Sequence, residues 1–490
     1  VDIHSLSAQQ LRIVIDAQPV SQAALSVTST GLSLTTTPGS GLPDFLRRKL
    51  ADLELPVEVA TGLLTLCSAG ALFRAIGRGR PPIRYGKLAV GAAVSVMYAA
   101  PYLVEWVSQH ASLVFMLPGD DWRTYEGYAR DIREHSLLML QGATPGHAVP
   151  FYFQPLYPYW LALLHTLAGE SVQAAVLAQQ LAIVVAIVLI ATTLPDHRGY
   201  LAGMLFVFAT GIVVEWFRLG TFLLSENLLL LVFAALLAGV GQLERRPAYL
   251  LLVLIGALLG VGILTRTTTW LAVPVVLWIV CRAAKPSVTV RRAAVAAVPL
   301  ILVITFVPIR NYFAAGSATP VPTSTTPYLY VALVPESHYD TAPTSGEAGI
   351  GGVVRAVLKQ PGAVARQRLL NLAYVLGFPR SLSHDDVPLI FAPLLLLWLL
   401  APLGLLWRPR SKVALVSLAL ALTHCLALVI IWPNSYYYRM VIPATLPLAV
   451  WDIFVVAQLF AGLPEPSWLG SRLRQRWPGP PSQVAAQLDG

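Results

Sequence analysis

Charge is scarce in this sequence. Asp, Glu, Lys and Arg make up 12% of the 490 residues, while hydrophobic residues make up 56%. Because a soluble domain usually carries about 25% charged residues, this composition excludes a water-soluble globular protein. We expect a polytopic membrane protein whose helices face lipid and one another.

Cysteine is also rare, with only Cys67, Cys281 and Cys425. All three lie inside apolar runs, and their spacing matches neither a metal site nor a disulfide framework. We interpret them as free, buried thiols.

The formal net charge of +9 is carried in short basic segments between apolar runs, such as RAIGRGRPPIRYGK, RAAKPSVTVRR and WRPRSK. Such segments set the orientation of membrane helices, so we expect no nucleic-acid partner. We detect no internal repeat and no inverted pair of broken helices of the kind that transporters use.

Residues 1–52 differ from the rest because β-branched residues alternate there between turn residues. This pattern predicts two or three strands, in a small β-rich segment that packs on something else. Because the chain begins with Val1, we expect a processed or incomplete N-terminus.

The apolar runs predict an all-α integral membrane fold with about eleven spans. The spans lie near residues 56–76, 87–107, 171–194, 199–217, 222–242, 248–265, 269–282, 293–311, 387–407, 412–432 and 440–461. With this count, the strongly basic connections all fall on the cytoplasmic side. Counting the aromatic, proline-rich stretch 151–168 as a twelfth span reverses that orientation, so we assign it to an interfacial helix.

This topology divides the chain into seven parts. We predict an external β-rich segment (1–52), two spans (53–107) and a first external loop with interfacial helices (108–170). A block of spans (171–312), a second external loop (313–386), three spans (387–462) and a cytoplasmic tail (463–490) follow. We therefore expect a multi-pass protein of the plasma (inner) membrane, with its N-terminus outside and its C-terminus inside.

The first external loop contains an acidic pair, Asp120 and Asp121, directly after the turn Pro118-Gly119. An Asp at this place can cap a new helix, on which Asp121, Tyr125 and Tyr128 share a face. Glu126 and Arg130 have the spacing of an ion pair on the other side of that helix. A capped helix on the membrane surface explains these residues without a catalytic role, and that interpretation stays open here.

Several charged residues lie at the outer ends of predicted spans: Glu215, Arg218, Glu226, Arg266, Arg310 and Arg439. One arginine alone is explained by a side chain reaching toward lipid headgroups. Four arginines from separate spans, on the side that carries the acidic pair, suit an anionic phosphate beside a carboxylate.

The stretches DDWRTYEGYA, FQPLYPYWLALLHTLAG, LLSENLLLL, GVGILTRTTTW, VPIRNYFAAGSATPVPTSTTPYLY and YYYRMVIPATLPL follow one another in this chain. In order and spacing they resemble the GT-C superfamily of membrane glycosyltransferases, and within it the branch of protein O-mannosyltransferases and the lipid A aminoarabinose transferase. The resemblance covers residues from about 87 to 461. This chain departs from the family in its extra first span, its N-terminal segment and its short second external loop.

The resemblance implies an enzyme that moves a hexosyl or pentosyl group, with inversion, from a polyprenyl-phosphate sugar to an acceptor hydroxyl outside the membrane. It implies Asp121 as the catalytic carboxylate, with Asp120 in reserve. Arg266, Arg310 and Arg439 are the candidates for the donor phosphate, and Tyr125, Glu226, Asn311 and Tyr437 for donor or acceptor contacts. Glu226 is equally well explained as a structural partner of Arg218 or Arg266.

The resemblance leaves a divalent cation possible and no cofactor certain, since only some GT-C enzymes use a metal. His384, Asp385 and Asp386 stand together, but capping of the next helix explains Asp386. We assign no role to His147 and His165. The partners implied are a lipid-linked sugar, the membrane, an acceptor protein, lipid or glycan, and a protein bound through the N-terminal segment.

Two other classes of protein remain as alternatives. A transporter or flippase for a lipid-linked precursor needs polar residues deep in several spans, where this sequence offers mainly His424 and Gln179 or Gln180. A non-catalytic structural subunit built on the GT-C scaffold is the other.

Overall fold

The fold is seen in a computed structural model of the 490 residues. The residues that it describes are the strands between residues 3 and 37, residues 87, 90–93 and 95, and the stretches 121–135, 151, 153–170, 172–195, 198–316, 318–320, 322, 350–378, 388–407, 411–431 and 440–462. The chain divides into two compact units. One is Val1–Ala60 with Val107–Gln109, and the other is Thr61–Trp106 with His110–Gly490.

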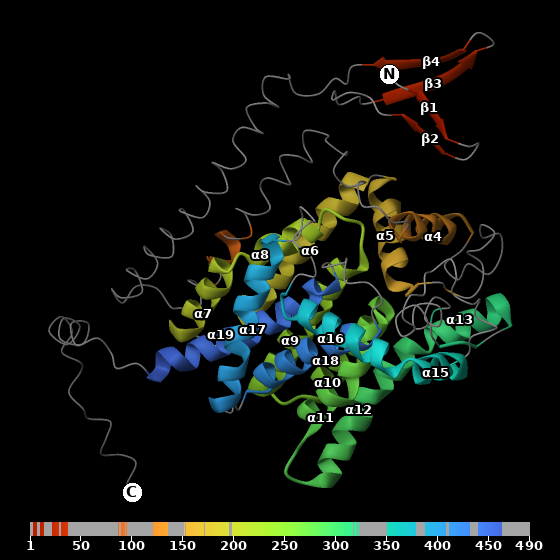
Figure 1. The fold of residues 1–490 in the computed structure, drawn as a ribbon. Helices are drawn as coiled ribbons and strands as arrows, with labels where there is room; N and C mark the ends of the chain where they lie inside the picture. The colour runs from red at the N-terminus through yellow and green to blue at the C-terminus, as the bar shows by residue number, and fades with distance from the viewer. Residues whose placement is uncertain are drawn as a thin grey trace, which may run out of the picture. The chain divides into compact units, whose positions relative to one another are not determined.

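The first unit contains two separate antiparallel hairpins (Figure 1). Strand β1 (Ile3–Leu6) pairs with β2 (Gln10–Ile13), and β3 (Gln22–Thr28) pairs with β4 (Gly31–Thr37). These strands lie in the segment for which the alternating sequence predicts strands.

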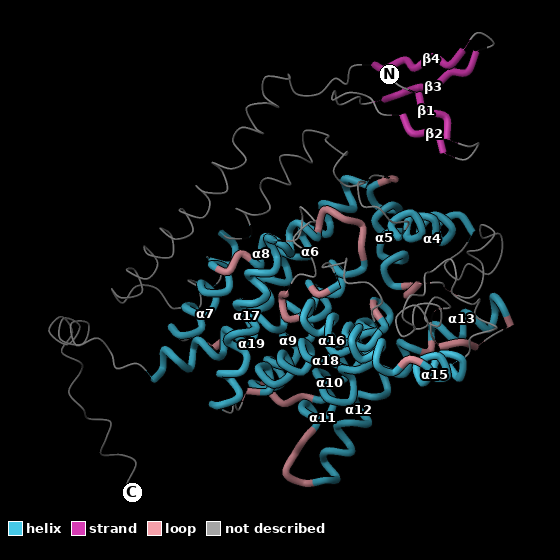
Figure 2. The backbone as a smooth tube through the Cα atoms, viewed as in Figure 1, coloured by secondary structure: helices cyan, strands magenta, loops and turns pink. Residues whose placement is uncertain are grey.

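In the described residues of the second unit, helices are joined by short loops and no strand occurs (Figure 2). Its first helices are α4 (Asp121–His135), α5 (Leu156–Ala168), α6 (Val172–Thr193), α7 (Arg198–Ala209), α8 (Ile212–Leu219), α9 (Ser225–Arg245) and α10 (Tyr249–Thr265). A short 3₁₀ helix η2 (Thr267–Leu271) leads to α11 (Ala272–Cys281), α12 (Pro286–Ile304) and α13 (Phe306–Ala315). The last are α15 (Ile350–Lys359), α16 (Pro361–Val375), α17 (Pro388–Trp407), α18 (Lys412–Ile431) and α19 (Ile442–Gly462).

Five helices of the described part are long and apolar enough to cross a membrane, or six if the bent pair α7 and α8 forms one span. They are Ala174–Thr193, Ser225–Arg245, Pro286–Ala314, Lys412–Ile430 and Ile442–Phe460. Three shorter apolar helices, Tyr249–Thr265, Thr267–Cys281 and Pro393–Leu406, fall where spans are predicted. The protein is thus an α-helical membrane protein, while most of the two spans predicted within 53–107 lies outside the described residues.

The predicted span 199–217 is not one straight helix. Helices α7 and α8 meet at an angle of 63°. The break falls at Gly211, whose φ of 80° is left-handed and therefore favours glycine. A hydropathy pattern does not register such a bend, because both halves are apolar.

The helix that contains the start of the predicted span 293–311 begins before the span. Helix α12 begins at Pro286, so Arg291 and Arg292 lie inside the helix rather than in a connection. Proline is well suited to the first helical turn, where its missing N–H leaves no intrahelical bond unmade. Arg291 lies over the Tyr249 ring at 4.9 Å, so the basic end of α12 packs on the start of α10.

Helices α10 and α12 approach each other closely at glycine. A Cβ atom placed on Gly256 meets the backbone oxygen of Ala296 at 1.9 Å, and one placed on Gly260 meets the Val303 side chain at 2.8 Å. Small residues that let backbones approach are the usual basis of helix packing in lipid, where burial of apolar surface gives no driving force.

We predict that Gly256→Ala separates α10 from α12 and destabilises the protein by about 1–3 kcal/mol, the usual cost of an overpacked core. Thermal unfolding in detergent measures the effect. Gly362→Ala is the matched control, because a Cβ atom there meets nothing within 4 Å. Equal melting temperatures for the two variants contradict the prediction.

Candidate active site

Helix α4 is held against α5 by aromatic side chains. The Tyr125 ring lies 5.3 Å from Phe153 and 5.0 Å from Tyr157, between ring centroids, and the Tyr128 ring lies 6.3 Å from Phe151. Tyr125 and Tyr128 are both buried. Asp121 is the first residue of α4, one helical turn before Tyr125. Within the second unit, the helix is therefore packed on α5 and on the segment before it through Tyr125 and Tyr128.

A partly buried contact between His165 and Glu126 adds to this packing. The His165 Nε2 atom on α5 lies 2.9 Å from the Glu126 Oε2 atom on α4, and His165 Nδ1 lies 3.3 Å from the Gly169 backbone oxygen. The imidazole thus connects the two helices through one contact at each ring nitrogen. The sequence assigns His165 no role and suggests Arg130 as the partner of Glu126. Nothing in the local sequence indicates this pair, because its members are 39 residues apart.

The connection that leads into α9 is fixed by a buried amide network. The Asn227 side chain donates to the Phe222 backbone oxygen at 2.9 Å and to Gln179 Oε1 at 3.1 Å. Gln179 also donates to the Gly220 backbone oxygen at 3.2 Å and accepts from the Tyr157 hydroxyl at 2.7 Å. Burial raises the pKa of Tyr157 well above its ordinary value, so the phenol remains a donor. The network ties α5, α6 and the start of α9 together, and so fixes Glu226.

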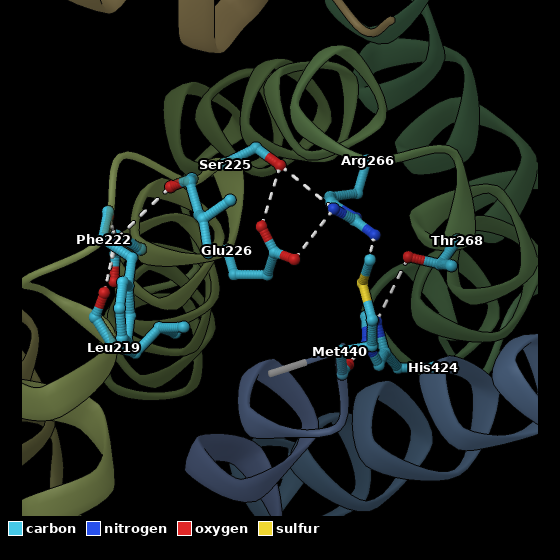
Figure 3. Close-up of polar contacts among 10 residues, drawn as sticks. Leu219, Phe222, Ser225, Glu226, Arg266, Thr268, His424 and Met440 are labelled. Atoms are coloured by element: carbon cyan, nitrogen blue, oxygen red, sulfur yellow. Dashed lines mark hydrogen bonds and ion pairs between the residues drawn. The ribbon is translucent and has the colours of Figure 1, made fainter. Parts of the chain in front are cut away.

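Glu226 forms an ion pair with Arg266 at the meeting point of α9 and α10 (Figure 3). Glu226 Oε1 lies 3.1 Å from Arg266 Nη1, as an ion pair rather than a well-aligned hydrogen bond, and Glu226 Oε2 accepts from the Ser225 hydroxyl at 3.2 Å. The Glu226 side chain is 1% exposed, and that of Arg266 is 17% exposed. A carboxylate this deeply buried needs the neighbouring cation, because its desolvation is costly.

The Arg266 guanidinium is oriented by three residues. Nη1 donates to Ser225 Oγ at 3.2 Å and faces Glu226, while Nη2 lies 2.6 Å from the Met440 sulfur at the start of the α19 segment. The described residues offer Nε no acceptor. The guanidinium is thus held at both Nη atoms and is partly exposed, an arrangement in which a phosphate oxygen can reach the remaining donors.

Arg310 lies in a different environment. Its guanidinium carbon is 4.2 Å from the centre of the Phe151 ring, and Nη1 donates to Asn311 Oδ1 at 3.2 Å. Asn311 Oδ1 also accepts from the Phe151 backbone N–H at 3.3 Å, and Asn311 Nδ2 donates to the Thr319 backbone oxygen at 3.0 Å. Arg310 and Asn311 are both fully buried. In this structure they hold the segment before α5 against α13, whereas Arg266 keeps an exposed portion.

Three predicted site residues, Asp120, Tyr437 and Arg439, fall outside the described residues, and for Asp121 the backbone is described and the side chain is not. His147 and the group His384, Asp385 and Asp386, to which the sequence gives no catalytic role, also lie outside the described residues. Within the described ranges, no group of three or more His, Cys, Asp and Glu side chains is placed to hold a metal ion. The structure therefore brings Glu226 and Arg266 together and Arg310 and Asn311 together, in two separate groups.

One protein family matches part of the chain. Residues 148–310, from the segment before α5 to Arg310, match the family model described as dolichyl-phosphate-mannose-protein mannosyltransferase. The range contains His165, Glu226, Arg266 and Arg310 but not Asp121. Searches of curated proteins and of solved structures found no significant match.

This match confirms the resemblance of the chain to GT-C membrane glycosyltransferases, over the helices that hold the Glu226–Arg266 pair. Together with the apolar helices, it supports a membrane glycosyltransferase related to the mannosyltransferases.

We predict that His165→Leu loosens α4, because it leaves Glu126 without its buried partner. Hydrogen exchange of the backbone amides in residues 121–135 is expected to become faster. Arg133→Leu is the control, because its pair with Glu170 at 2.9 Å is much more exposed and contributes little. If α4 exchanges equally fast in both variants, the buried pair does not hold the helix.

Proposed function

We propose that this protein transfers a sugar from a polyprenyl-phosphate donor to an acceptor hydroxyl on the extracytoplasmic face of the membrane, with inversion at the anomeric carbon. The observation that carries the proposal is the Glu226–Arg266 pair, in which a buried carboxylate orients a partly exposed guanidinium. This pair lies in the range that matches the mannosyltransferase family, as expected if Arg266 binds the donor phosphate.

The ends of the helices support the sidedness of the proposal. Ser225 begins α9, Thr265 ends α10, and Met440 lies two residues before α19. The candidate site is therefore formed where three helix ends meet. At the opposite ends, Glu244 near the end of α9 accepts from Ser411 before α18 at 3.0 Å, and Lys412 donates to Val280 in α11 at 3.1 Å. The basic connections lie at these opposite ends, which the positive-inside rule assigns to the cytoplasm.

In the proposed reaction, the acceptor oxygen forms a bond to the anomeric carbon as the bond from that carbon to the phosphate oxygen breaks. The electron pair of the broken bond stays on the lipid phosphate. The acceptor proton passes to a carboxylate, for which Asp121 is the candidate and Asp120 the reserve. A single displacement of this kind inverts the configuration of the sugar.

Each arginine has a part in this reaction. Arg266 stabilises the negative charge that develops on the departing phosphate. We keep Arg439 as a second phosphate ligand from the sequence, with Tyr437 as its neighbour. Arg310 and Asn311 contribute first by holding the segment that leads into α5, so that Tyr125 and Tyr157 form the wall of the site. The eleven-span topology and the external N-terminal segment belong to the same proposal.

Two phenols of α5, those of Tyr157 and Tyr159, are neutral near pH 7, because burial raises the pKa of both. Burial raises the pKa of Tyr159 to about 12, although the nearby Arg310 acts in the opposite direction. Near neutral pH, Tyr159 therefore supplies a hydroxyl group and no charge, and the carboxylate of Asp121 remains the proposed base.

We predict that Asp121→Asn lowers sugar transfer by about 10²- to 10⁴-fold, the usual contribution of a positioned general base. Purified protein in nanodiscs, supplied with a panel of polyprenyl-phosphate sugars, measures the transfer. Donor binding should be retained, and Asp120→Asn, measured in parallel, shows which of the two carboxylates is the base. Transfer at the wild-type rate by Asp121→Asn overturns the assignment of the base, and donor binding without turnover in the wild type contradicts enzyme activity toward that panel.

We further predict that Arg266→Gln weakens binding of the polyprenyl-phosphate donor by roughly 10- to 100-fold, the worth of a hydrogen bond to a charged group. Arg291→Gln is the charge-matched control, because that arginine lies over Tyr249 at the opposite end of the helices. Equal loss of donor affinity in both variants indicates a general effect of charge instead of a phosphate site.

A further inference from the structure

A buried histidine on α18 lies beside the candidate site. His424 is 3% exposed, and its Nε2 atom lies 2.9 Å from the Met440 backbone oxygen. Because a carbonyl oxygen only accepts, Nε2 carries a proton and donates. The Nδ1 atom lies 3.2 Å from the Thr268 hydroxyl, which can donate to its lone pair. The two contacts therefore fit a neutral ring with a defined tautomer.

A neutral ring also agrees with its surroundings. The Arg266 guanidinium contacts the side chain of Met440, the same residue whose backbone oxygen His424 holds. A second cation buried next to this guanidinium lacks a partner among the described contacts of His424 and is costly. The ring packs edge-on against Phe233 at 6.2 Å between centroids, and this contact supports its orientation.

These contacts link four residues in a closed chain of contacts (Figure 3). Arg266 contacts the Met440 sulfur, the Met440 backbone oxygen accepts from His424, and His424 contacts Thr268, which follows Arg266 by two residues. These four residues join the end of α10 and η2 to α18 and to the start of the α19 segment. Glu226 and Ser225 attach α9 to the same guanidinium.

We propose that His424 is a positioning residue for the donor phosphate. It fixes the backbone of Met440, so that the Met440 sulfur limits the rotation of the Arg266 guanidinium on the side opposite to Glu226. The guanidinium is thereby presented to the donor phosphate in one orientation before the donor arrives, which lowers the ordering cost of binding. This inference rests on the proposed function and adds to it a residue that touches neither donor nor acceptor.

His424→Leu and His424→Gln form the test pair, since Gln can restore a donor near the position of Nε2 and Leu cannot. We expect His424→Leu to weaken binding of a polyprenyl phosphate by about tenfold, as a lost buried hydrogen bond does. His424→Gln should recover most of that affinity. Binding is measured with purified full-length protein in nanodiscs and a polyprenyl monophosphate as the probe, and thermal unfolding shows that both variants are folded.

A double-mutant cycle with Arg266→Gln separates positioning from a general structural role. If His424 acts through Arg266, His424→Leu causes little further loss of affinity in the Arg266→Gln background. Equal, additive losses in both backgrounds overturn the inference, as does equal affinity of the Leu and Gln variants. A wild-type protein that binds no polyprenyl phosphate contradicts the proposed function and the inference with it, whereas wild-type binding unaffected by His424→Leu contradicts the inference alone.

Discussion

The site depends on the burial of one carboxylate. Glu226 is almost inaccessible, and its charge is stabilised there chiefly by the Arg266 guanidinium. The pair also fixes the start of α9 relative to the end of α10, because Glu226 is in the first turn of α9 and Arg266 directly follows α10. The contact between Glu226 and Arg266 therefore serves both the packing of these helices and the proposed phosphate site.

The second physical constraint is the need to satisfy polar groups at the ends of helices. Asn227 and Gln179 bind the backbone oxygens between α8 and α9. At the end of α18, Arg368 donates to the Val429 backbone oxygen at 3.0 Å, and it supplies positive charge where the helix dipole favours it. These contacts hold short polar segments in fixed positions inside an otherwise apolar protein, so that the site has a rigid frame.

Much of the helical frame is predictable from the sequence, because apolar runs and basic flanks carry strong signals over many residues. Helices α6, α9, α18 and α19 fall close to predicted spans. The bend at Gly211 and the start of α12 at Pro286 are not predictable in this way, since hydropathy averages over single residues that decide local geometry. For the candidate site, Glu226 and Arg266 come from motif order, and of the two arginines that the sequence offers Glu226 as partners, the structure shows the pair with Arg266. His424 stands out in the sequence as a polar residue within a span, but no local pattern indicates the distant partners that it and His165 contact.

The helical segment Pro286–Ala314, which joins α12 to most of α13, has a consequence for the surrounding bilayer. It contains 29 residues, and only 17% of its most apolar stretch is buried inside the protein. At 1.5 Å per residue it is roughly 43 Å long, while the hydrocarbon core is about 30 Å thick. The helical segment must therefore tilt or extend into the headgroup layer. Its close packing on α10 at Gly256 and Gly260 helps to set that tilt, so the way in which this long segment fits the bilayer depends on two glycines of the neighbouring helix.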